Sequence, residues 1–323
     1  MSIRNRLQAQ IIKLLLIMVR FVKRVLSSVV CEHITVFTYE ANALIDNEDF
    51  KNLKYNNSKL RVFNGCQLSI KRKLYLLLIT DKLFMYQLSN TASLDFAKKW
   101  RPELDTIVFY WNTLSCADGV FLNFHNELKR SYNVREASFD PVDCREFGMK
   151  YMDMFYSTSK IEHAKGTDEP KFDVSLIAVA KSRLKDLLKV EKLLKKHKLK
   201  VNSYITNSYE LSNDKYDYKP HLSPDEYLPK EFESRVICEV VEKGQNDPTI
   251  RAVIALLAKK KLITNHKNII HKDYYNQENI FILGKDDESK LYEFVKSPYQ
   301  DVVPAEIVDQ YTPRGFLKRL KEF

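Results

Sequence analysis

Short apolar stretches alternate with polar or amphipathic segments along most of the chain. In the first half, runs rich in β-branched and aromatic residues are typical of strands, and they lie at 34–39, 60–63, 74–80 and 106–111. Near-continuous apolar strands separated by longer segments predict a parallel sheet that is covered on both faces.

The pattern is clearer in the second half, where leucines recur at helical spacing over residues 181–197 with lysines on the other face. A Ser-Pro pair at 223–224 and an Asp-Pro pair at 247–248 predict the starts of two more helices. Strands are expected between and around these helices, at 173–179, 201–206, 235–241, 261–264 and 279–283.

A polar stretch at 157–171, which contains Gly166 and Pro170, separates the two halves and is interpreted as a linker. A chain of 323 residues is long enough for two domains of ordinary size. We therefore predict an N-terminal α/β domain at 1–156 and a C-terminal α/β domain at 172–323. The expected fold class is α/β, with two Rossmann-like domains that face each other across a cleft.

Residues 3–26 form a basic, amphipathic pattern at the N-terminus. The uninterrupted apolar run from Leu14 to Val19 is far shorter than the roughly 20 apolar residues that a membrane span needs. A helix of this kind can rest on an anionic membrane surface. It can equally pack on its own domain with a solvated basic side, and the sequence leaves both interpretations open.

The formal net charge of +10 is compatible with nucleic acid, an acidic membrane surface or an anionic substrate. The basic stretches lack an aromatic RNA-binding motif, so a nucleic-acid partner is not expected. The five cysteines are dispersed, which is typical of reduced thiols in a cytosolic protein. We expect a cytoplasmic protein, with residues 3–26 as a possible peripheral contact to the inner face of the membrane.

The common site signatures are missing from the sequence: the P-loop, GxGxxG, HExxH, GxSxG, the kinase catalytic loop and DxD. What remains is the stretch EKGQNDPTIR, in which a helix is expected to begin directly after a strand. Helix N-termini at the carboxyl end of a parallel sheet suit a diphosphate, and Thr249, Arg251 and Gln245 lie beside this one. The alternative is an ordinary capped helix with Arg251 on the surface.

The block ICEVVEKGQNDPTIRAVIALLAKKKLITNHKNIIHKDYYNQENIFIL, at 237–283, resembles the C-terminal part of a group of bacterial glycosyltransferases. These are encoded in lipopolysaccharide and capsule gene clusters and are expected to adopt the GT-B fold. Their pattern is roughly Q-x-G-x-T-x-R, then K-K-L-I-T-N-N, then Y-x-x-x-N-I-F-I. Blocks at 138–156 and 173–194 also fit, so that the likeness covers about residues 106–320.

The resemblance implies an enzyme that moves a sugar from a nucleotide-sugar donor to a glycan or lipid-linked acceptor, without a metal or another cofactor. It also implies a donor site in the C-terminal domain, formed by Lys181, Arg183, Glu239, Gln245, Thr249, Arg251 and Asn265. If the reaction inverts the stereochemistry of the transferred sugar, a base from the N-terminal half would deprotonate the acceptor hydroxyl. By location alone, the candidates for this base are Glu40, Asp118 and His125.

Three positions depart from the family pattern on the donor side. Ile254 replaces an acidic residue, Asp247 replaces a glycine, and Ala178 replaces the glycine of the first strand-to-helix turn. Glu242 is a candidate to take over from the missing acid. These departures keep a second hypothesis open, in which the chain is a catalytically inactive, glycosyltransferase-like binding or scaffold subunit.

Overall fold

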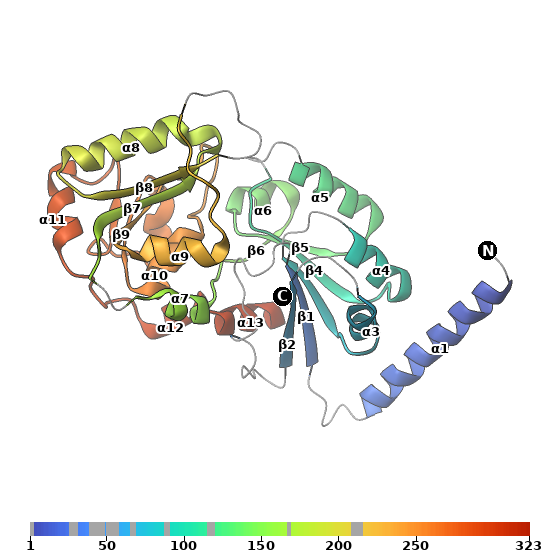
Figure 1. The fold of residues 1–323 in the computed structure, drawn as a ribbon. Coiled ribbons are helices and arrows are strands. Elements are labelled where there is room, and N and C mark those ends of the chain that lie inside the picture. Colours follow the sequence, from blue (N-terminus) through green and yellow to red (C-terminus); the bar gives the residue numbers. More distant parts are fainter. Residues whose placement is uncertain are drawn as a thin grey trace. The chain divides into compact units, whose positions relative to one another are not determined.

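The computed structural model describes residues 3–25, 32–38, 49, 58–64, 69–86, 91–114, 120–166, 169–207 and 216–323 (Figure 1). Contacts within the chain divide it into two units. One extends to Ser138 and the other begins at Phe139.

The first unit is built on parallel strands that lie side by side in the order β2, β1, β3, β4, β5. Apolar residues of its central strands, such as Ile34, Phe84 and Val108, are fully buried. Its elements are α1 (Ile3–Val25), β1 (Glu32–Thr38), β2 (Ser58–Asn64), α3 (Ile70–Leu78), β3 (Lys82–Tyr86), α4 (Ala92–Trp100), β4 (Asp105–Tyr110), α5 (Val120–Ser131) and β5 (Arg135–Ser138).

The strand predicted at 74–80 is wrong, because residues up to Leu78 belong to helix α3. The Ser69 side chain caps this helix by accepting the Arg72 N–H at 3.3 Å. Strand β3 follows at Lys82–Tyr86, where no strand was predicted. A short apolar run fits a buried strand and a helix equally well, so periodicity alone could not distinguish them.

In the part of the chain that the structure describes, no helix is both long enough and apolar enough to cross a membrane.

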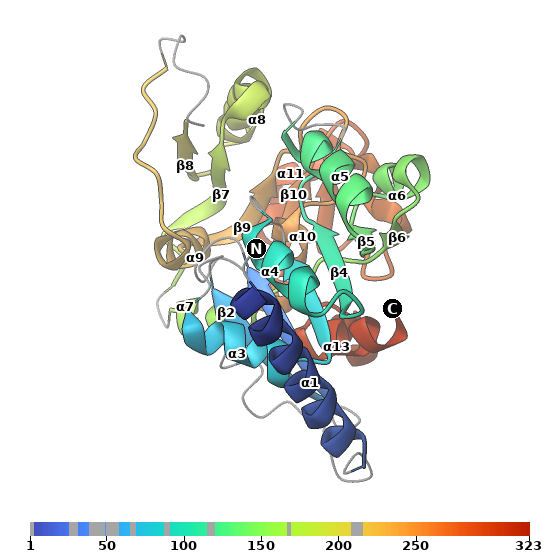
Figure 2. The same cartoon turned by 90° about the vertical axis from the view of Figure 1, so that its right-hand side faces the viewer.

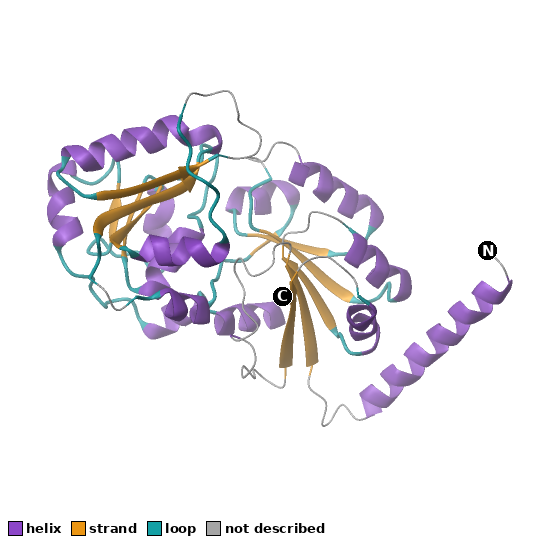
Figure 3. Ribbon diagram, in the orientation of Figure 1, coloured by secondary structure: helices purple, strands orange, loops and turns teal. Residues whose placement is uncertain are grey.

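The second unit contains a five-stranded parallel sheet in the order β11, β10, β9, β7, β8. Helices flank both faces of this sheet (Figure 3). The elements are α6 (Pro141–Phe147), β6 (Lys150–Tyr151), α7 (Thr158–Ala164), β7 (Phe172–Val179), η1 (Lys181–Arg183), α8 (Leu184–Lys196), β8 (Val201–Thr206), α9 (Pro224–Phe232), β9 (Ser234–Glu239), α10 (Ile250–Ala258), β10 (Lys261–Thr264), η2 (Lys267–His271), β11 (Ile280–Ile282), η3 (Glu288–Lys290), α11 (Leu291–Lys296), α12 (Ala305–Gln310) and α13 (Pro313–Glu322).

Alternate residues of β7 face different layers of the second unit. Val174 and Leu176 pack into a core that also contains Leu187 of α8 and Leu291 of α11. On the other face, the Ser175 hydroxyl donates to the carboxylate of Glu231, on α9, at 2.8 Å. A strand that is covered on both faces explains why 172–179 is almost continuously apolar.

The strand order makes β7 the point where the chain reverses direction across the sheet. From β7 the chain runs to β8 at one edge, and it then returns to β9 on the other side of β7. Such a topological switch point opens a crevice at the carboxyl ends of the two strands, where ligands of open α/β sheets bind. The predicted α/β class with two parallel, Rossmann-like sheets is confirmed.

The boundary between the two units differs from the predicted domain limits, since it falls between Ser138 and Phe139. The stretch interpreted as a linker, 157–171, lies inside the second unit and contains α7. The Ser157 hydroxyl caps α7, Ile161 is buried at 1% exposure, and the helix contacts α9 and α10. A capped helix with one buried apolar residue is polar enough in sequence to resemble a linker.

Candidate functional site

Polar side chains gather in the turns that follow β7, β9 and β10, at the carboxyl ends of these neighbouring strands. The turn after β7 contributes Lys181 and Ser182, and the turn after β9 contributes Glu242. Because β7 and β9 flank the switch point, these three residues occupy the position in which an open α/β sheet binds its ligand.

The Lys181 side chain is accessible and pairs with the acidic side chain of Glu242. Its Nζ lies 3.3 Å from Oε2 of Glu242, and the Ser182 hydroxyl lies 3.3 Å from Oε1 of the same carboxylate. The Lys181 side chain is 45% exposed, and that of Glu242 is 14% exposed. The backbone of Lys181 has φ = 43°, a left-handed conformation that is uncommon for residues other than glycine and is often found at functional sites.

Arg183, the second residue of the predicted basic pair, points the other way. It is buried, and its guanidinium donates to the carbonyl oxygens of Val179 and Val240. Burial and the nearby Arg251 cation lower the pKa of Arg183 to about 10. Arg183 therefore ties the ends of β7 and β9 together, and Lys181 is the accessible cation of the pair.

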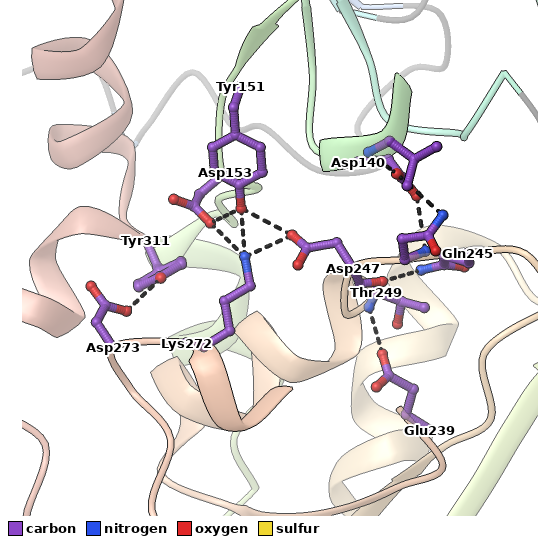
Figure 4. Close-up of polar contacts among 12 residues, drawn as sticks. Asp140, Tyr151, Asp153, Glu239, Gln245, Asp247, Thr249, Lys272, Asp273 and Tyr311 are labelled. Carbon is purple, nitrogen blue, oxygen red and sulfur yellow. Dashed lines mark hydrogen bonds and ion pairs between the residues drawn. The ribbon is translucent and has the colours of Figure 1, made fainter. Parts of the chain in front are cut away.

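Glu239 ends β9 with a carboxylate that is fully buried. It accepts the backbone N–H of Thr249 at 2.7 Å (Figure 4). It also accepts the hydroxyl of Thr264 at 2.8 Å. Burial raises the pKa of this carboxyl above its usual range, although both hydrogen bonds favour the charged form. Glu239 thus holds the first turn of α10 and the end of β10 in place.

Helix α10 begins two residues later than predicted. Thr249, not Asp247, is its N-cap: the Thr249 hydroxyl accepts the Arg251 N–H at 3.1 Å, and the helix starts at Ile250. The Asp247 side chain is not free to cap because Lys272 and Tyr151 bind it. One amide of the predicted anion site, that of Thr249, is already bound to a carboxylate of the protein.

Arg251 faces into the second unit. Its Nη2 donates to the carbonyl oxygen of Ile177 at 2.7 Å, and its guanidinium lies 5.6 Å from the ring centre of Tyr227. Burial opposes its charge, but Tyr227 and the carboxylates of Glu231 and Glu239 outweigh this effect and raise the pKa of Arg251. The side chain balances two fully buried acids, Glu231 and Glu239, and is only partly accessible.

The remaining predicted donor residues bind the loops of the site to one another. The Gln245 amide donates to the carbonyl oxygen of Asp247 at 2.7 Å, and Oδ1 of Asn265 accepts the N–H of Val241 at 2.7 Å. Ile254, which stands where the family has an acidic residue, is 1% exposed in α10. An acid at that position would point into the core of this unit.

A charged cluster beside the start of α10 includes residues to which the sequence analysis gave no role. Lys272 Nζ lies 2.7 Å from Asp247 and 3.0 Å from Asp153. The Tyr151 hydroxyl oxygen lies 2.6 Å from Asp153 and 3.0 Å from Asp247, so its single proton can be donated to either carboxylate (Figure 4). Burial raises the pKa of Asp247 to about 6, against the opposing effect of Lys272. All four residues lie in blocks that carry the family resemblance, which is the one signal that could have singled them out.

Asp140 connects α6 to the same loop. Its carboxylate is fully buried, caps α6 by accepting the Val142 N–H at 2.8 Å, and accepts the Asn246 N–H at 2.9 Å (Figure 4). The loop between β9 and α10 is therefore held at both Asn246 and Asp247 by side chains from other segments of the second unit.

Two of the three candidate bases, Glu40 and Asp118, lie outside the described residues. His125 is on α5 and is 4% exposed. Its Nδ1 lies 2.7 Å from Oε1 of Glu136, which also accepts the Tyr110 hydroxyl at 2.8 Å. His125 is thus an interior histidine of the first unit with a carboxylate partner, and its assignment as a base stays a prediction.

In the described part of the chain, no group of three or more His, Cys, Asp and Glu side chains is arranged to hold a metal ion.

No family model and no curated protein matches the chain. Among solved structures, the chain is similar to UDP-N-acetylglucosamine 2-epimerase from Rickettsia bellii, with 12% identity, a TM-score of 0.47, and coverage of 90% of this chain and 95% of that chain. It is also similar to a glycosyltransferase from Rickettsia africae ESF-5, with 11% identity, a TM-score of 0.44, and coverage of 90% of this chain and 97% of that chain. At TM-scores below 0.5 these similarities do not identify an activity, which has to be argued from the site itself.

Proposed function

We propose that this protein is a glycosyltransferase that binds a nucleotide-sugar donor at the carboxyl end of its second sheet. The observation that carries the proposal is the group of Lys181, Ser182 and Glu242 at the switch point between β7 and β9, in which the Lys181 side chain is accessible. The family resemblance of residues 237–283 supports a nucleotide sugar as the ligand, and it alone supports a surface glycan as the acceptor.

In this proposal Lys181 takes the role that the sequence suggested for Arg251. A lysine ammonium with one partly exposed partner can exchange that partner for a diphosphate at low cost, because accessible ion pairs are weak. The charge of Lys181 would offset the charge that develops on the leaving nucleoside diphosphate. Glu242, released from Lys181, would accept hydrogen bonds from donor hydroxyls, and no metal ion is required.

A thermal-shift panel of nucleoside diphosphates and their sugars tests the proposal. A ligand at 100 times its dissociation constant adds about 2.7 kcal/mol to the free energy of unfolding, which is a rise of several degrees for a unit of this size. We expect such a rise with one nucleotide and its sugars, and we expect it to persist in EDTA. If none of them shifts the midpoint, the donor site does not exist.

A second candidate is a non-catalytic relative that keeps the fold and binds a partner. The observation that favours it is the hydrogen bond between Glu239 and the Thr249 N–H, which places a protein carboxylate where the first helical amides would meet a phosphate. A chain that binds a nucleotide sugar but neither transfers nor hydrolyses the sugar, with glycan acceptors present, would support this candidate.

A further inference from the structure

Helix α1 has an apolar face that the first unit leaves uncovered. Among its described side chains, Leu16 alone is buried, at 4% exposure, and α1 contacts α3 (Figure 2). At about 100° per residue, Leu14, Met18 and Val22 lie on the side of the helix roughly opposite Leu16. These three side chains are 61%, 63% and 53% exposed.

Helix α3 adds a second uncovered stripe. Ile70, Leu74 and Leu78 are spaced four residues apart and therefore share one face of the helix. They are 78%, 52% and 38% exposed, whereas Leu76 is fully buried. Two helices in contact thus both expose aliphatic side chains, and large exposed apolar surfaces mark sites of interaction.

The charge of the two helices indicates what covers this surface. Helices α1 and α3 contain nine of the 52 basic residues of the chain and none of its 42 acidic residues. They therefore account for nine units of the formal net charge of +10, and the rest of the chain is almost neutral. A partner that matches both properties is apolar and anionic.

We propose that α1 and α3 together form a docking surface for an anionic lipid bilayer. The apolar side chains would enter the boundary between headgroups and acyl chains, with α1 in the plane of the interface, and the lysines and arginines would bind lipid phosphates. A second copy of this chain fits less well, because it would bring nine further positive charges against the first nine. This inference does not depend on the proposed sugar transfer.

Flotation of the full chain with vesicles tests the docking surface. Vesicles of phosphatidylcholine with phosphatidylglycerol are compared with vesicles of phosphatidylcholine alone, for the wild type and for Val22→Asp, Leu74→Asp and Val302→Asp. Val302, in the second unit, is 52% exposed and matches Val22 and Leu74 in accessibility. We expect binding that requires the anionic lipid and falls about tenfold or more with Val22→Asp and with Leu74→Asp. Val302→Asp is expected to bind as the wild type does.

Three results would overturn the proposal. One is equal binding to neutral and anionic vesicles, and another is binding that neither Val22→Asp nor Leu74→Asp weakens. The third is a wild-type dimer that ignores vesicles and dissociates on Val22→Asp, which would assign the surface to a second copy. If a variant unfolds, the salt dependence of the wild type decides: release from vesicles at high salt supports the proposal, and unchanged binding contradicts it.

Discussion

Two charged groups lie near each other at the carboxyl ends of β7 and β9, yet they hold their charges in opposite ways. The Lys181 side chain, in the turn after β7, is 45% exposed, and its Nζ lies 3.3 Å from Oε2 of Glu242, in the turn after β9. At the end of β9, Glu239 is fully buried and accepts hydrogen bonds from Thr249 and Thr264.

This difference indicates which of the two charged groups is suited to a ligand. An accessible ion pair contributes at most about 1 kcal/mol, so a ligand can displace it at little cost. Breaking a buried charge network leaves uncompensated groups behind and costs several kcal/mol. Glu239, at the end of β9, therefore has a structural role, and Lys181, in the turn after β7, is the residue that can exchange its partner for a phosphate.

The largest expected effect comes from truncating the buried acid. Glu239→Ala removes a carboxylate that accepts the Thr249 N–H and the Thr264 hydroxyl and that balances Arg251. We expect the free energy of unfolding to fall by about 3–5 kcal/mol. Chemical denaturation measures this change.

Glu242→Ala is the matched control, because it makes the same change in an acid whose partner is accessible. It is expected to cost no more than about 1 kcal/mol. Equal losses for the two variants would remove the contrast between the buried acid and the accessible ion pair.

The next effect concerns pH, through Asp247 in the loop before α10. Its pKa of about 6 in the folded state lies above the ordinary aspartate pKa of about 4, so between these pH values the folded state holds a proton that the unfolded state has lost. The stability that this carboxyl contributes is present at low pH and is lost as the pH rises from about 4 to about 6. Asp247→Asn has no carboxyl to titrate and keeps its stability as the pH rises. The difference in free energy of unfolding between this variant and the wild type should therefore change by roughly 1–3 kcal/mol in favour of the variant over that pH range.

Denaturation curves for both proteins across this pH range provide the test. A constant difference between them would mean that Asp247 titrates at its ordinary value and that its burial beside Lys272 has been misjudged.

A smaller effect is expected at the cap of α10. Thr249→Ala removes the hydroxyl that accepts the Arg251 N–H, and loss of an N-cap side chain costs about 1 kcal/mol. Thr249→Ser keeps the hydroxyl and should lose much less. If the serine variant loses as much as the alanine variant, the methyl group of Thr249 matters and the cap does not.

The smallest effect on stability is expected for Lys181→Ala. Its ion pair with Glu242 is accessible, so the free energy of unfolding should change by less than about 1 kcal/mol in a denaturation experiment. A larger loss would mean that Lys181 is part of the fold, and it would weaken its assignment to a ligand.

The second sheet could be predicted from the sequence because its strands are buried on both faces. Strands at 173–179 and 201–206 match β7 and β8 closely, since continuous apolar runs bounded by polar turns leave few alternatives. Residues 74–80 could not be assigned in this way, because the same kind of run is amphipathic in α3 and leaves Leu74 and Leu78 exposed.

The site was harder to predict because its geometry depends on residues that are distant in the sequence. An Asp-Pro pair favours a helix start, but Lys272 and Tyr151 hold the Asp247 side chain, so Thr249 caps α10 instead. Spacing alone also could not show that Lys181 points outward while Arg183 points inward. That difference follows from the left-handed backbone at Lys181 and from the carbonyl groups that Arg183 binds.

The central claim is that the turn after β7 binds the nucleotide part of a donor, and calorimetric titration of lysine variants tests it most directly. Lys189→Ala is the control, because Lys189 is also an accessible lysine with an acidic partner. Its Nζ lies 3.4 Å from Oδ1 of Asp186, which is close to the 3.3 Å between Lys181 Nζ and Oε2 of Glu242. With the nucleoside diphosphate that stabilises the wild type most, Lys181→Ala should weaken binding by about tenfold or more, which is the loss of a charged hydrogen bond. Lys189→Ala should bind as the wild type does. Equal affinity of Lys181→Ala and the wild type would contradict the account.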